Sequence, residues 1–108
     1  MSLYRFKSRE TGDLVMLEPH GKRVLEIIGK DPSAAGVILP QQMSAAEQAL
    51  HDAVVLEEAD QRRQREEAQA KGDPPPEFDS VSLRVRSTPF IEMMQRCEKA
   101  GVEVVWGV

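Results

Sequence analysis

The sequence predicts a small α+β fold, in which an N-terminal β-hairpin and a C-terminal strand form an antiparallel or mixed sheet packed by about three helices. Three observations carry this prediction. Apolar and polar residues alternate at both ends of the chain, as in strands. Proline and glycine signals bound segments of helical periodicity. The charged middle part of the chain contains few apolar residues that could enter a core. The 108 residues fit one domain with a single core.

The N-terminal segment predicts the hairpin. Aromatic and basic residues alternate in LYRFKS, residues 3–8, as in a half-buried strand. Gly12 stands where a short hairpin needs a positive φ angle, and LVML, residues 14–17, is the expected returning strand. Because LVML is apolar at every position, we expect this strand to be central in its sheet.

A first helix is predicted between Pro19 and Gly29, because proline suits the first turn of a helix and glycine its end. One side of this helix is apolar and the other is charged. The apolar arc contains Val24, Leu25, Ile27 and Ile28, and the opposite side contains Lys22, Arg23 and Glu26. Pro32 prevents the helix from resuming, and GVIL, residues 36–39, can form an extended piece.

Ser44 and Glu47 form an S-x-x-E capping box, which predicts the start of a second helix. Its apolar arc contains Ala46, Ala49, Leu50, Ala53, Val54 and Leu56. Beyond that arc, opposite charges four residues apart can support an exposed helix: Glu58/Arg62, Arg62/Glu66 and Arg63/Glu67. Gly72 and the run 73–76 end it. Within a single domain of residues 1–108, we therefore predict that residues 57–79 form a charged arm, solvated and continued by a proline-rich connector.

Thr88 and Pro89 predict the N-cap and first residue of a third helix that continues to Ala100. One face of this helix gathers Phe90, Ile91, Met93, Met94 and Cys97. Gly101 ends it, and alternation in residues 102–108 predicts a C-terminal strand. Residues 81–86 are either extended or an early turn of the same helix bent at Pro89. We favour the extended form, because a helix would place Val81 and Val85 on its polar side.

Two stretches carry a family resemblance: TGDLVMLEPHGKRVLEIIGK near the start and VSLRVRSTPFIEMMQRCEKAGVEVVWG at the end. Together they resemble a family of short proteobacterial proteins, the domain of unknown function eighteen-forty. The resemblance covers both ends of the chain and skips the charged middle. It implies a bacterial cytoplasmic protein, and it implies no activity, cofactor or catalytic residue.

Composition argues against several classes of partner. The net charge of −4 disfavours a broad grip on nucleic acid or anionic lipid. The cluster Arg62, Arg63 and Arg65 has no adjacent aromatic residue for base stacking, so nucleic-acid binding is not expected. No apolar run approaches the roughly 20 residues of a membrane span. The single cysteine, Cys97, cannot form an intramolecular disulfide, which suits a reducing cytoplasm.

Few residues suggest a small-molecule site. HGKR, residues 20–23, lacks the flanking residues of a phosphate loop. Basic residues near a helix N-terminus can still attract an anion, and the candidates for such an anion-binding site are Lys22, Arg23, Arg84 and Arg86. Glu47, His51 and Glu58 follow one side of the second helix, but a metal needs three or four converging ligands, so we expect no metal and no cofactor.

No catalytic residue is predicted. No nucleophile elbow, paired cysteine motif or dinucleotide fingerprint occurs. Cys97 falls in the middle of an apolar helix face, where cysteine acts as a small core residue. We predict a non-catalytic interaction module with a protein partner or self-association, because the expected strands carry more apolar surface than one layer of short helices covers. The alternatives are a small-molecule or anion-binding protein and a metal-dependent enzyme.

Overall fold

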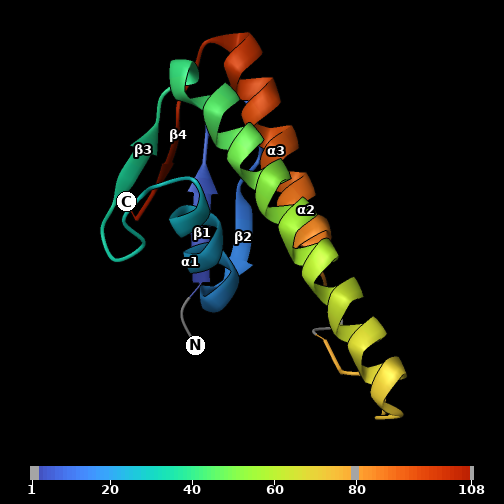
Figure 1. The fold of residues 1–108 in the computed structure, drawn as a ribbon. Helices are drawn as coiled ribbons and strands as arrows, with labels where there is room; N and C mark the ends of the chain where they lie inside the picture. The colour runs from blue at the N-terminus through green and yellow to red at the C-terminus, as the bar shows by residue number, and fades with distance from the viewer. Residues whose placement is uncertain (1–2, 79–80, 108) are drawn as a thin grey trace.

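The computed structural model describes residues 3–78 and 81–107 as a two-layer structure, with helices on one face of a four-stranded sheet (Figure 1). The elements in chain order are β1 (Leu3–Lys7), β2 (Leu14–Leu17), α1 (Glu18–Ile27), β3 (Gly36–Ile38), α2 (Pro40–Lys71), α3 (Leu83–Ala100) and β4 (Val104–Trp106). The predicted α+β class, with an N-terminal hairpin and a C-terminal strand in one sheet, is confirmed.

The strand order is β2-β1-β4-β3, and every neighbouring pair is antiparallel. The two ends of the chain therefore meet in the middle of the sheet, where Phe6 lies opposite Trp106. The prediction that LVML is central is wrong, because β2 is an edge strand. Its apolar character has another consequence: Val15 and Leu17 point away from the helices and remain 42% and 45% exposed.

The hairpin connection does not use Gly12 as predicted. Among the described residues, the glycines with positive φ are Gly29, Gly72, Gly101 and Gly107. The connection spans residues 8–13, which is longer than the two-residue turns that require positive φ. Inside it, the Ser8 hydroxyl accepts the Glu10 backbone N–H at 3.1 Å.

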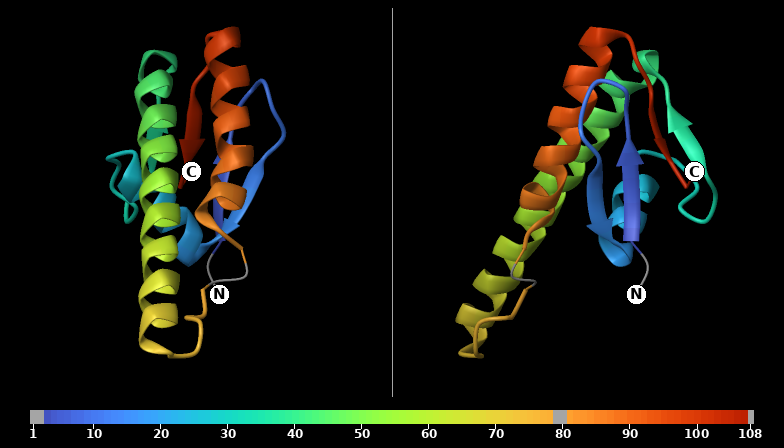
Figure 2. Two further views of the ribbon diagram at one scale, coloured as in Figure 1. Left: turned by 45° about the vertical axis from the view of Figure 1, so that its right-hand side comes forward. Right: turned by 180° about the vertical axis from the view of Figure 1, so that it is seen from behind.

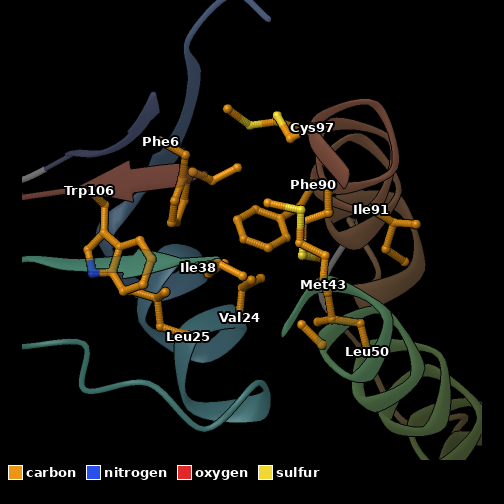
Figure 3. Packing of buried hydrophobic residues seen from close by; sticks show 14 of the residues in the cluster. Phe6, Val24, Leu25, Ile38, Met43, Leu50, Phe90, Ile91, Cys97 and Trp106 are labelled. Atoms are coloured by element: carbon orange, nitrogen blue, oxygen red, sulfur yellow. The ribbon is translucent and has the colours of Figure 1, made fainter. Parts of the chain in front are cut away.

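The core lies between the sheet and the helices and is centred on aromatic rings (Figure 3). Phe6 meets Phe90 edge to face, with ring centroids 4.8 Å apart, and its centroid is 6.1 Å from that of Trp106. The predicted apolar face of the third helix is buried in full: Phe90, Ile91, Met93, Met94 and Cys97. The prediction that Cys97 is a core residue is confirmed, and its Sγ lies 2.9 Å from the Ser8 hydroxyl.

Two glycines allow elements to approach the sheet closely. A Cβ atom at Gly21 would lie 2.6 Å from Tyr4 Cβ, so α1 rests directly on β1. A Cβ atom at Gly36 would lie 2.4 Å from Trp106 Cζ2, and the indole N–H donates to the Ala34 carbonyl at 3.1 Å. Only glycine permits either contact, because a larger residue would overlap the aromatic side chain. The predicted extended piece thus becomes β3, against β4.

α2 begins four residues before the predicted capping box. Pro40 is its first residue, and the Gln42 side chain accepts the Leu39 backbone N–H at 3.0 Å. Proline is pre-organised for this position, and Gln42 performs the back-bonding expected of Glu47. Ser44 is therefore an exposed interior residue of the helix. The predicted apolar arc also ends earlier than expected, because Leu56 is 71% exposed.

The second half of α2 extends away from the sheet (Figure 2). No residue of α2 beyond Val54 is buried, and the helix ends at Gly72, with φ of 74°. The radius of gyration is 15.9 Å, whereas a compact chain of this length has about 13 Å. Of the predicted intrahelical ion pairs, Arg63 to Glu67 forms at 2.9 Å.

α3 begins at Leu83, so the predicted start at Thr88 and Pro89 is wrong, and residues 83–86 are helical rather than extended. Ser82 is the N-cap, and its hydroxyl accepts the Val85 N–H at 3.2 Å. Pro89 lies inside the helix, where it removes one backbone hydrogen bond. A well-capped helix tolerates that loss at an exposed position. Val85 stays 60% exposed, on the polar side that the helical wheel indicated.

Candidate functional site

The structure separates the four basic residues proposed as an anion site. Arg23 and Arg86 line one pocket of about 300 Å³, which lies between α1, α2 and the start of α3. We call it the Glu57 pocket, after one of the carboxylates that line it; Glu77 and Phe78, which follow α2, line it as well. Lys22 and Arg84 do not line it.

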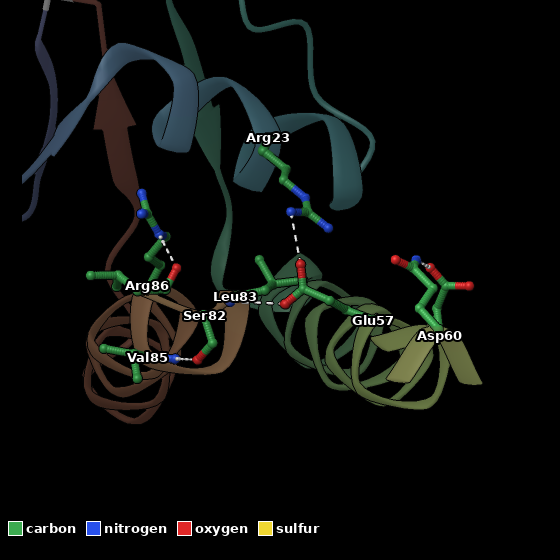
Figure 4. Close-up of polar contacts among 9 residues, drawn as sticks. Arg23, Glu57, Asp60, Ser82, Leu83, Val85 and Arg86 are labelled. Atoms are coloured by element: carbon green, nitrogen blue, oxygen red, sulfur yellow. Dashed lines mark hydrogen bonds and ion pairs between the residues drawn. The ribbon is translucent and has the colours of Figure 1, made fainter. Parts of the chain in front are cut away.

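Glu57 joins three helices (Figure 4). Its Oε1 accepts a hydrogen bond from Arg23 Nη1 at 3.0 Å, and its Oε2 accepts the Leu83 backbone N–H, also at 3.0 Å. The side chain of Glu57 is only 17% exposed. A helix N-terminus attracts negative charge. The protein's own carboxylate therefore occupies the place that an external anion would take at the start of α3.

Two more of the four cations are paired with carboxylates of the chain. Arg84 makes a bidentate contact with Glu58, with N to O distances of 2.8 and 2.7 Å. Hydrogen bonding from Arg84 lowers the pKa of the Glu58 carboxyl and raises that of the guanidinium. Lys22 Nζ lies 2.7 Å from Glu18 Oε1, and this contact raises the pKa of Lys22.

Arg86 differs from the other three. Its Nε donates to the Val81 carbonyl at 3.0 Å, and within residues 3–78 and 81–107 no carboxylate forms an ion pair with its guanidinium. Arg86 is also half-buried, so less water screens its charge. Of the predicted anion-binding residues, it is the one without a carboxylate partner among the residues that the structure describes.

Arg86 also reaches a second cavity, an apolar groove of about 330 Å³ between the edge strand β2 and the beginning of α3. We call it the β2–α3 groove. It is lined by Leu14, Val15, Met16, Leu17, His20, Val81, Val85, Arg86 and Pro89. Sequence reasoning missed this groove, because it treated residues 81–86 as a separate extended piece. The signal in the sequence was the pair Val81 and Val85, two apolar residues on the polar side of the helical wheel.

The sheet face opposite the helices is a third surface, which we call the open face (Figure 2, right). Residues directly opposite each other in neighbouring strands point to the same side. The register pairs Leu3 with Leu17, Arg5 with Val15, and Lys7 and Val37 with Val105. These seven residues therefore share the open face, and five of them are aliphatic.

The candidate metal ligands do not converge. Glu47 Oε1 lies 3.6 Å from His51 Nε2, and it also accepts a hydrogen bond from the Gln95 amide. Glu58 contacts Arg84 instead. Nowhere in the described parts of the chain do three or more His, Cys, Asp or Glu residues gather in a metal-binding arrangement. The same residues include no helix with the length and apolar character needed to cross a bilayer.

Comparison with known proteins identifies the family. The model described as Domain of unknown function (DUF1840) matches residues 2–106. The chain belongs to this family. The DUF1840 match runs through the charged middle, which corrects the expectation that the similarity skips that part. Neither the curated proteins nor the solved structures contain a match to this DUF1840 chain.

Proposed function

We propose that this protein is a non-catalytic interaction module of the bacterial cytoplasm, and that its open face associates with a second copy of the chain. The observation that carries the proposal is apolar exposure on that face. Leu3 is 55% exposed, Leu17 45%, Val15 42% and Val37 37%. An antiparallel sheet that keeps one face in water normally carries polar residues there. Aliphatic residues contributed by all four strands indicate a face that is covered in the assembled state.

A second copy suits the open face for two physical reasons. Two sheets can pack face to face with their strands roughly aligned, so that aliphatic side chains from both sheets interdigitate. Of the two cations on this face, Arg5 and Lys7, Arg5 lies 3.4 Å from Asp13 of the hairpin connection, so an acid is present beside the patch. A two-fold axis brings the same patch onto itself, so the cation of one copy can meet the acid of the other. Burial of aliphatic surface supplies about 25 cal/mol per Å².

The small-molecule alternative has less support. Three of its four candidate residues, Lys22, Arg23 and Arg84, are bound to carboxylates of the chain itself. An external anion would have to displace Glu57 from both Arg23 and the Leu83 N–H. That exchange leaves the poorly exposed carboxylate of Glu57 without its hydrogen-bond donors, which raises the free energy of the folded protein.

The test is the molar mass in solution, measured by size-exclusion chromatography with light scattering up to several hundred micromolar protein. We expect a dimer for the natural chain and a monomer for the double variant Leu3→Lys/Val37→Lys, which places two charges on the open face. The matched control is Val55→Lys, since Val55 is 62% exposed but lies on α2. It should remain dimeric. A strict monomer for the natural chain at the highest concentration refutes the proposal, as does a double variant that still dimerises.

A further inference from the structure

We propose that the β2–α3 groove binds an extended, apolar segment of a partner protein that carries an acidic side chain. The segment would add to the outer edge of β2 as a further strand, and its acidic residue would contact Arg86. This site uses the edge of the sheet and the beginning of α3, and it shares Val15 and Leu17 with the open face.

The edge of β2 is suited to strand addition. Within the part of the chain that the structure describes, β2 pairs with β1 alone, so every second residue of LVML turns its N–H and C=O groups outward. Natural edge strands are usually protected by lysine, proline or a bulge. β2 contains no lysine or proline, and its register with β1 runs without interruption from Leu14 to Leu17. A partner strand can therefore hydrogen-bond along its whole length.

The start of α3 forms the opposite wall. Val81 is 39% exposed and Val85 60%, and Pro89 follows Val85 by four residues, so these two helical residues lie on the same side of α3. Pro89 has no N–H, so the Val85 carbonyl lacks its usual helical donor. The wall thus combines apolar side chains, which suit alternate residues of an extended segment, with a backbone carbonyl that receives no hydrogen bond from residue 89.

The charges of the groove define the chemistry of the segment. Of the described residues that line the groove, His20 and Arg86 are the only ones that can carry charge, and none is a carboxylate. His20, Val81 and Arg86 also line the Glu57 pocket, so they mark the end of the groove where the two cavities meet. A partially buried guanidinium forms strong, bidentate hydrogen bonds with a carboxylate. Charge complementarity therefore selects an acidic residue at that end.

The direction of the added strand determines where the acidic residue lies in the sequence of the partner segment. Leu14 and Pro89 both line a neighbouring cavity beside the hairpin loop, whereas His20 and Arg86 lie toward the end at which β2 leads into α1. Antiparallel pairing is the more stable mode per residue. An antiparallel segment begins beside Leu17 and ends beside Leu14. Its acidic residue should therefore precede its apolar residues in sequence.

The first experiment selects a random heptapeptide library, displayed on phage, against the full chain carrying Leu3→Lys/Val37→Lys. Those two substitutions are chosen to prevent the proposed self-association, and neither residue lines the groove. We expect enrichment of peptides with an Asp or Glu followed by alternating apolar residues and without internal proline. Selection against the same protein with Val85→Asp should lose that enrichment. No enrichment, or equal enrichment with Val85→Asp, overturns the proposal.

The second experiment is a double-mutant cycle by calorimetric titration, using a selected peptide and its Glu→Gln or Asp→Asn analogue. Arg86→Gln and the peptide substitution should each weaken binding about tenfold or more, and together they should weaken it little further, because both remove the same contact. Arg84→Gln is the matched control and should leave the dissociation constant unchanged, since Arg84 is held by Glu58. Additive losses, or an effect of Arg84→Gln equal to that of Arg86→Gln, would argue against an Arg86 contact.

Hydrogen exchange then locates the segment. On peptide binding, the outward amides among residues 14–17 should become protected, because they gain partners in the added strand. Circular dichroism and thermal melting must first show that each variant is folded. If Arg86→Gln is not, Arg86→Lys serves in its place, since it retains the charge but loses the bidentate geometry and should bind more weakly. Protection confined to other strands is incompatible with strand addition at β2.

Discussion

Glu57 of α2 accepts the backbone N–H of Leu83 at 3.0 Å, 26 residues later in the chain, so one helix caps the start of another. The same carboxylate holds Arg23 of α1. Glu57 and Glu58 had been expected to begin the charged arm. Both instead connect α2 to other elements, although Val55 and Leu56 before them are already exposed.

Replacing Glu57 should destabilise the fold. In Glu57→Ala, the Leu83 N–H and the Arg23 guanidinium lose their acceptor, and we expect a loss of about 1–2 kcal/mol in the free energy of unfolding. Urea denaturation measures it. Glu66→Ala is the matched control on the same helix, because Glu66 is exposed, and it should change stability by less than about 0.5 kcal/mol. Equal effects of the two substitutions would contradict the capping role.

Ser82 is the N-cap that the structure shows, and Ser44 is the N-cap that the sequence predicts. Replacing each by alanine should change the stability differently. Ser82→Ala removes the acceptor of the Val85 N–H and should cost about 1 kcal/mol. Ser44→Ala should be neutral or slightly stabilising, because Ser44 is an interior residue of α2 and alanine has the higher helix propensity. Thermal unfolding compares them directly. A larger loss for Ser44→Ala would place the start of α2 at the capping box instead.

The contact between Arg84 and Glu58 should be visible in the titration of the carboxyl. The pKa of Glu58 lies below its ordinary value of 4.5, chiefly because Arg84 hydrogen-bonds its charged form. The contact therefore stabilises the fold above that ordinary value, and the contribution is lost as the pH falls through the lowered pKa of the folded state. Carboxyl carbon NMR should show that Arg84→Gln raises the pKa of Glu58. Arg62→Gln should raise it less, since the charge of Arg62 affects the pKa of Glu58 less than the hydrogen bond and charge of Arg84 do. The reverse order would contradict the contact.

Shortening the charged arm should have little effect on stability. Deletion of residues 61–71 removes about three helical turns, which preserves the phase of the remaining helix, and none of the deleted residues is buried. The contact of Arg65 with the Phe78 ring is lost, but such exposed contacts contribute little. We expect the melting temperature to shift by less than about 4 °C. Loss of cooperative unfolding would show that this part of α2 supports the core.

Local patterns in the sequence predicted most elements correctly. Alternation in LYRFKS and in the C-terminal strand placed β1 and β4, and the apolar face from Phe90 to Cys97 became the buried side of α3. Glycine signals also marked helix ends, because Gly29, Gly72 and Gly101 adopt the positive φ that other residues avoid. Each of these features depends on the preferences of neighbouring residues, which a sequence displays directly.

The sequence by itself determined the α+β class, the buried face of α3 and the C-terminal ends of the helices, because periodicity and chain-breaking residues act over a few positions. Only the tertiary structure decided that LVML lies at an edge, that Glu57 caps α3, and that Arg86 alone among the four predicted cations keeps no carboxylate partner within the described residues. These outcomes depend on contacts between residues far apart in the chain. No local pattern encodes which strand lacks a neighbour or which carboxylate reaches a distant helix.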